Sequence, residues 1–143
     1  MSSWRDTVSA EAQDDLDGLT ALVLETAERH LASHGEFAPF AAGISQSGAA
    51  SLSHGAPDGD ESSSADLLEA LYEGAREEAA TERAVAFAAD VAVEGSDAVR
   101  IELEHREGVA LCLIVPYGRR RLRRGVTFSD MTVNAGDPRV WTS

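Results

Sequence analysis

The chain has 143 residues, of which 12 are basic and 25 are acidic, so its formal net charge is −13. This charge disfavours nucleic acid and anionic membranes as partners, because both repel an acidic protein. Every basic residue is an arginine, which excludes lysine chemistry, and Cys112 is the single cysteine, which excludes an intramolecular disulfide. The length and the 43% hydrophobic content predict one domain over residues 1–143, and the absence of a signal-like or membrane-length apolar stretch predicts a cytoplasmic protein.

The first periodic segment predicts a helix from about Ser9 to His34, after a flexible N-terminus of about residues 1–8. Apolar residues recur at three- and four-residue steps, as in Leu16, Leu19 and Val23, which places them on one stripe of a helix. Gly35 follows directly and suits the position after a helix, where a positive φ is required.

Residues 37–54 predict a β-hairpin. Gln46-Ser47-Gly48 fits a three-residue loop, which places Ile44 opposite Ala50. A mobile loop over about residues 55–63 and a second helix from about Ser64 to Thr81 follow.

The second half predicts an antiparallel meander of three strands, around residues 85–93, 99–105 and 109–117. Arg106-Glu107-Gly108 forms a three-residue loop between the last two, which places Leu103 opposite Leu111. For the first turn two registers are open: one pairs Asp90 with Arg100 and the other pairs Asp90 with Glu102. We favour the first, because opposite charges across a strand pair are stabilising.

In this register the small and charged side chains of the meander share the face that the helices do not cover. A smooth surface of this kind suits a partner or a second copy of the chain, because little side-chain entropy is lost on docking. We therefore predict a partner or dimer face made of Ala84, Ala86, Ala88, Arg100, Glu102, Cys112 and Ile114.

The order of elements is helix, two strands, helix and three strands, with room for one more strand around residues 122–128 and an irregular tail over about 129–143. Two helices covering one face of an antiparallel sheet make a two-layer α+β domain. This order resembles that of roadblock-like and secretion-chaperone-like modules, a likeness of topology alone.

Four polar aromatic side chains are candidates for a ligand pocket between the helices and the sheet: His30, His34, Tyr72 and His105. His30 and His34 are four residues apart on the first helix, a spacing that can serve a metal ion. Leu31 stands where a zinc-hydrolase helix carries glutamate, so we favour packing over ligation and predict no metal.

The most basic segment holds Arg119, Arg120, Arg121, Arg123 and Arg124. It contains no aromatic residue for stacking on bases, and the rest of the chain is acidic, so contact with an acidic protein surface is favoured over nucleic acid. A surface loop without a partner stays open.

The segments His34–Phe40 and Leu103–Gly108, with Pro116-Tyr117, resemble a family of small, acidic, uncharacterised bacterial proteins. The likeness spans most of the chain, from the first helix to Trp141. It implies a stand-alone domain with no assigned activity, and it lends no catalytic residue and no cofactor.

Taken together, the sequence favours a non-catalytic protein-interaction or chaperone-like module that acts as a homodimer. The alternative is a small-ligand-binding or enzymatic domain with a pocket between the helices and the sheet. A cavity of roughly 300 Å³ or more would favour the alternative, whereas a filled core would favour the module.

Overall fold

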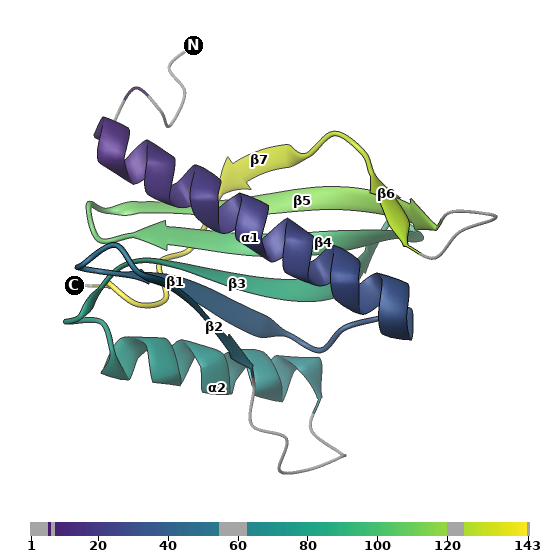
Figure 1. Cartoon of the computed structure of the whole chain (residues 1–143), viewed down its shortest axis with the longest axis horizontal. Helices are drawn as coiled ribbons and strands as arrows, with labels where there is room; N and C mark the ends of the chain where they lie inside the picture. The colour runs from purple at the N-terminus through teal and green to yellow at the C-terminus, as the bar shows by residue number, and fades with distance from the viewer. Residues whose placement is uncertain (1–5, 7, 55–62, 120–124, 143) are drawn as a thin grey trace.

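The computed structural model describes residues 6, 8–54, 63–119 and 125–142 and shows an α+β fold (Figure 1). Two helices accompany a seven-stranded antiparallel sheet. In chain order the elements are α1 (Ala10–His34), β1 (Phe40–Ser45), β2 (Ala50–His54), α2 (Ser64–Glu77), β3 (Glu82–Val93), β4 (Ser96–His105), β5 (Val109–Arg119), β6 (Val126–Phe128) and β7 (Thr132–Ala135). Neither helix is long and apolar enough to cross a membrane.

The two helices begin and end much as their sequences predict. The Ser9 side chain accepts the N–H of Ala12 at the start of α1, and Gly35, at φ 79°, ends that helix. Ser63 caps α2 in the same way. Only the end of α2 differs: it stops at Glu77, short of the expected Thr81.

The strands follow the order β2-β1-β3-β4-β5-β6, with β7 also paired to β5. The predicted pairing of Ile44 with Ala50 is confirmed, as is that of Leu103 with Leu111. Both hairpins have the expected glycine at positive φ, Gly48 and Gly108. Turn chemistry therefore determines these two registers.

The predicted register between β3 and β4 is wrong by one residue. Val93 pairs with Ser96, so the connection is a two-residue turn with Glu94 at φ 52° and Gly95 at φ 83°. Asp90 consequently pairs with Val99. A turn with two positive φ values matches the twist of the strands, and this local preference outweighs a single charge pair across the sheet.

A shift of one residue moves every side chain of β3 to the other face. Ala84, Ala86 and Ala88 therefore lie on the same face as Ile101 and Leu103, beneath α1. The residues of β3 that alternate with these alanines, among them Val85 and Phe87, point to the opposite face.

The predicted placement of both helices on one face of the sheet is also wrong. α1 packs on the face that carries Phe40, Ala86 and Ile101, whereas α2 packs on the face that carries Val85 and Phe87. The sheet lies between the helices, which gives three layers. The reason is that β3 is apolar on both faces, so both can be covered.

The C-terminal tail is more regular than predicted. β6 lies within the expected strand region around residues 122–128, but β7 is an additional strand, paired with Leu111–Ile114 of β5. The segment after β7 returns to the α2 side of the sheet, where Val140 joins the core there.

Candidate functional site

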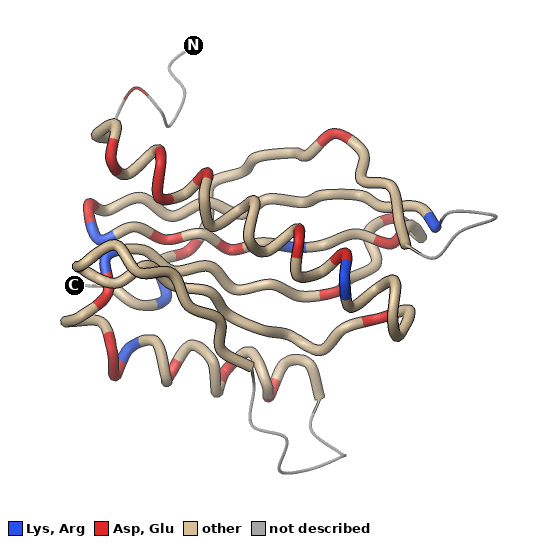
Figure 2. Tube along the Cα trace, viewed as in Figure 1, with Lys and Arg blue, Asp and Glu red and all other residues tan. Residues whose placement is uncertain are grey.

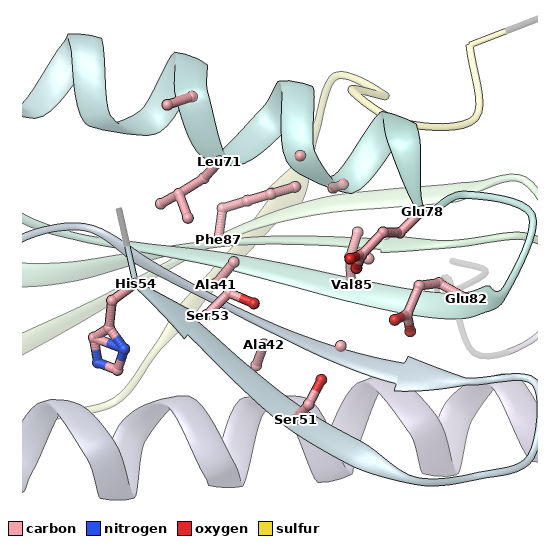
Figure 3. Close-up of a pocket in the computed structure, with 14 residues that line it drawn as sticks. Ala41, Ala42, Ser51, Ser53, His54, Leu71, Glu78, Glu82, Val85 and Phe87 are labelled. Atoms are coloured by element: carbon pink, nitrogen blue, oxygen red, sulfur yellow. The ribbon is translucent and has the colours of Figure 1, made fainter. Parts of the chain in front are cut away.

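A cavity of about 250 Å³ lies between α2 and the strands β1, β2 and β3 (Figure 3). Side chains of α2 form one wall, and the α2-facing side chains of the three strands form the other. At about 250 Å³ it is smaller than the roughly 300 Å³ that was expected to favour a ligand-binding domain, and none of His30, His34 and His105 lines it.

The cavity exists because small residues face one another across it. α2 contributes Ala70 and Gly74, one turn apart, and β1 contributes Ala41 and Gly43. A Cβ atom added at Gly74 would meet nothing within 4 Å, so this part of the helix borders open space. Larger residues at these positions would fill the gap between helix and sheet.

One end of the cavity is apolar. Leu71 of α2 and Phe87 of β3 meet there, and both are buried. Phe87 is held by an edge-to-face contact with Tyr72, with ring centroids 4.7 Å apart. This end offers a preformed surface to a hydrocarbon group.

The other end is acidic. Glu78, just after α2, and Glu82, the first residue of β3, project their carboxylates toward this end (Figure 3). Oε2 of Glu82 is shielded from solvent and has no hydrogen-bond partner in the part of the chain that the structure describes. Burial, and secondarily the charge of Glu78, raises the pKa of Glu82.

Two hydroxyl groups lie on the sheet wall between these ends. Ser51 pairs with Gly43 and Ser53 pairs with Ala41, so both serines face the cavity from β2. They could donate to or accept from a bound polar group. His54, the last residue of β2, also borders the cavity, but its ring points away from the cavity in Figure 3.

The electrostatic setting of the cavity is negative. Among the described residues that line it there is no arginine. Figure 2 shows acidic positions recurring along α2, with a basic position, Arg76, near its C-terminal end. The chain therefore presents an unneutralised pair of carboxylates in a partly apolar cavity.

Beside the cavity, two buried glutamates of β4 accept hydrogen bonds from the C-terminal segment. Glu104 accepts the backbone N–H groups of Arg139, Val140 and Trp141 at 2.6–3.2 Å. Glu102 accepts the Tyr72 hydroxyl and the guanidinium of Arg139. Burial and the hydrogen bond to Glu102 raise the pKa of the Tyr72 phenol, so Tyr72 is a neutral donor.

The structure does not bring the four predicted pocket residues together. His30 and His34 lie near the end of α1, where the ring of His30 contacts those of His54 and Phe40 at centroid distances of 5.9 and 6.2 Å. Tyr72 lies on the opposite side of the sheet. In the segments that the structure describes, no group of three or more His, Cys, Asp or Glu side chains is arranged to hold a metal ion.

His105 belongs to a buried ionic network at the start of α1. Its Nε2 lies 3.0 Å from Oδ2 of Asp15, and Arg83 donates two hydrogen bonds to the same carboxylate. The N–H of Glu107 donates to Nδ1 of His105, so that nitrogen carries no proton and the proton lies on Nε2. Both ring nitrogens are engaged, and this arrangement ties α1 to the sheet.

The predicted partner face is divided between the two sides of the sheet. Ala84, Ala86 and Ala88 are fully buried beneath α1 and are not a surface. Arg100, Glu102, Cys112 and Ile114 lie on the α2 side, where Glu102 is buried and the other three are partly exposed.

The predicted basic loop is described only at its first residue. Arg119 donates to the carbonyl of Gly35 at 2.7 Å and its guanidinium lies 5.9 Å from the ring of Tyr117. Arg120, Arg121, Arg123 and Arg124 lie outside the described residues.

Sequence reasoning missed the residues that form the cavity. A signal for part of it was present: Ala70, Gly74 and Glu78 follow one another at four-residue steps, a stripe of small residues that ends in a carboxylate. Nothing local indicated that Gly43 would lie beside Glu82, because the two meet only through the pairing of β1 with β3.

Comparisons with protein-family models, with curated proteins and with solved structures find no match to the chain.

Proposed function

We propose that this chain is a small-ligand-binding domain whose site is the cavity between α2 and the strands β1, β2 and β3. The observation that carries the proposal is a hollow lined by glycine and alanine that also contains a shielded, unpaired carboxylate oxygen, Oε2 of Glu82. Buried polar groups in folded proteins are normally hydrogen-bonded, so this oxygen beside a cavity requires a partner, and the proposal assigns that role to a ligand.

The size of the cavity limits the ligand. At about 250 Å³ it falls slightly below the range of sites for drug-sized molecules. The occupant is therefore a compact molecule, with one polar group for the acidic end and an apolar part for the end formed by Leu71 and Phe87.

Gly74 provides the variant that tests this proposal. Gly74→Leu extends an apolar side chain toward the cavity, and the substitution favours the helix, because leucine has a higher helix propensity than glycine. Gly18→Leu on α1 is the matched control: Gly18 is also helical with nothing within 4 Å of an added Cβ, but it does not border the cavity.

The measurement is a fragment screen by heteronuclear NMR. We expect compact fragments to shift the amide signals of Ala41, Gly43 and Leu71, and we expect Gly74→Leu to abolish these shifts while Gly18→Leu retains them. Shifts that persist in Gly74→Leu, or a screen in which no fragment moves these signals, would contradict the proposed function.

A second candidate, the homodimeric interaction module, is supported by the edge of the sheet rather than by its faces. All five residues of β2 are exposed, and β2 is an edge strand, with Leu52 38% exposed. An open edge can pair with a strand of another chain. Sedimentation over a range of protein concentrations tests whether a dimer forms, and NMR spectra at the same concentrations test whether the dimer forms through β2. A dimer that broadens the amide signals of β2 supports the module, and a monomer at every concentration contradicts it.

A further inference from the structure

We propose that the ligand is a small organic cation, a primary alkylammonium whose charged group lies between Glu78 and Glu82 and whose chain lies against Leu71 and Phe87. This inference rests on the proposed function and specifies the chemistry of the ligand.

The first step concerns Glu82. Its Oε2 is shielded from solvent and has no hydrogen-bond donor among the described residues, and it lies against Gly43, where an added Cβ would be 3.2 Å away. A buried carboxylate oxygen needs a proton or a donor, because its unpaired charge is costly. The absence of a side chain at Gly43 leaves room for this carboxylate beside the cavity, and the proposal requires the Glu82 side chain to rotate so that Oε2 meets the bound donor.

The second step concerns charge. The carboxylate of Glu78 lies close enough to Glu82 to disfavour its ionisation, and the described lining of the cavity holds no arginine to compensate either group. A cation placed at this end interacts favourably with both carboxylates. An anionic ligand would add a third negative charge, so anions are excluded on electrostatic grounds.

The third step concerns the kind of cation, an organic molecule or a metal ion. Two carboxylates are the only acidic ligands here, and the described segments hold no group of three or more metal-ligating side chains arranged for an ion. A bare ion would also leave the apolar end, formed by Leu71 and Phe87, without a function. A molecule with a charged head and a hydrocarbon body uses both ends.

The fourth step concerns the head group. A primary ammonium has three N–H donors on one compact centre. The acidic end offers the carboxylates of Glu78 and Glu82, and the Ser51 hydroxyl provides an acceptor on the sheet wall. Two carboxylates at one end of the cavity suit an ammonium, which can donate to both, better than a neutral hydroxyl, which donates only once.

The test compares three probes of equal chain length: hexylamine, hexan-1-ol and hexanoate. Hexylamine is protonated at pH 7, the alcohol is neutral and hexanoate is anionic. Binding is measured by titration of the Gly43 and Leu71 amide signals. We expect hexylammonium to bind at least about tenfold more tightly than hexan-1-ol, since charge-assisted hydrogen bonds contribute the larger share of its affinity, and we expect hexanoate not to bind.

Single substitutions test which carboxylates bind the charged group of the ligand. Glu82→Gln keeps the size of the side chain and removes its charge. We expect this variant to lower the affinity for hexylammonium by at least about tenfold and to change the affinity for hexan-1-ol little. Glu73→Gln is the matched control, because Glu73 lies on the exposed side of α2 and does not border the cavity. Glu78→Gln, at an exposed position, is the second variant and keeps the test available should Glu82→Gln fail to fold.

The outcomes distinguish this inference from the proposed function. Equal affinities for hexylammonium and hexan-1-ol, both lost in Gly74→Leu, would retain a ligand site but overturn its preference for cations. Hexylammonium binding that is unaffected by Glu82→Gln, Glu78→Gln and Gly74→Leu would show attraction to the acidic surface and overturn the inference. Absence of binding by all three probes would overturn it as well, and the fragment screen would then decide the function independently.

Discussion

The two faces of the sheet differ in how completely they are filled. On the α1 face, Leu19, Val23 and Ile101 are at most 1% exposed, and the buried Asp15 is fully paired with Arg83 and His105. On the α2 face the buried cluster is smaller and the hollow is larger, about 250 Å³ against about 90 Å³ beside Leu103 and Leu111 on the α1 face. Two shielded polar atoms there, Glu82 Oε2 and Trp141 Nε1, have no partner among the described residues.

This difference indicates a division of roles between the faces. Tight packing and satisfied polar groups stabilise a fold, whereas cavities and unpaired polar groups reduce its stability. Natural proteins retain such features mainly where they serve a function. We therefore expect the α1 face to contribute the larger share of the stability, and the proposed ligand site lies on the α2 face.

The sharpest test of this comparison truncates one leucine on each face. Leu19→Ala removes a fully packed side chain from the α1 face, and we expect it to lower the free energy of unfolding by about 3–4 kcal/mol. Leu71 borders the cavity and so has fewer atoms packed against it, and we expect Leu71→Ala to cost less, about 2 kcal/mol, the lower end for a buried leucine. Chemical denaturation of the two variants and the parent chain measures both values.

Equal losses in the two variants would show that the α2 face is as well packed as the α1 face. The comparison would then fail, and with it the argument that the cavity is retained for a function.

A second, more local test concerns the C-terminal segment of the α2 face. Glu104→Gln keeps one carbonyl acceptor but places an amide donor among backbone N–H groups that already donate, so the segment at Arg139–Trp141 should loosen. We expect hydrogen exchange of the Arg139, Val140 and Trp141 amides to accelerate by about tenfold or more, the equivalent of one charge-assisted hydrogen bond.

Glu107→Gln is the control for this experiment, because Glu107 also accepts two hydrogen bonds, from the backbone and side chain of Ser9 near α1. It should leave exchange at residues 139–141 unchanged. Unchanged exchange in Glu104→Gln would mean that apolar packing of Val140 alone holds the segment in place.

The sequence predicts those features of the fold that are encoded by residues adjacent in the chain. The end of the first helix at Gly35 and the hairpin turns at Gly48 and Gly108 are encoded by adjacent residues and were predicted. The turn at Glu94 was not, because a positive φ at glutamate is uncommon and the three-residue alternative paired charges well.

The layer arrangement and the cavity were missed for a related reason. Alternation along β3 shows that its residues point to two faces, but both sets are apolar, so the pattern does not show which face a helix covers. The site is less local still, since Gly43 and Glu82 lie on different strands and α2 completes the walls. Such a site depends on register, and the β3–β4 register was the one misassigned.

The smallest expected effect is a difference in the pH dependence of stability between Glu82 on the α2 face and His30 at the end of α1. Burial and the charge of Glu78 raise the pKa of Glu82 above its ordinary 4.5, so the folded state binds a proton more tightly and stability falls as pH rises from 4.5 through the raised pKa. Burial, together with the nearby His54, His34 and Arg29, lowers the pKa of His30 below 6.5, so stability falls as pH drops from 6.5 through the lowered pKa.

The two groups therefore contribute slopes of opposite sign, and single substitutions separate them. Relative to the parent chain, Glu82→Gln should become more stabilising as pH increases from 4 to 7, because the substitution removes the cost of a buried charge. His30→Gln should become more stabilising as pH decreases from 7 to 5, because a neutral amide cannot be protonated. Melting temperatures measured between pH 4 and pH 8 follow both trends. A Glu82→Gln profile parallel to that of the parent would show that water or a neighbouring donor already satisfies this carboxylate, and the strongest evidence for a function on the α2 face would be lost.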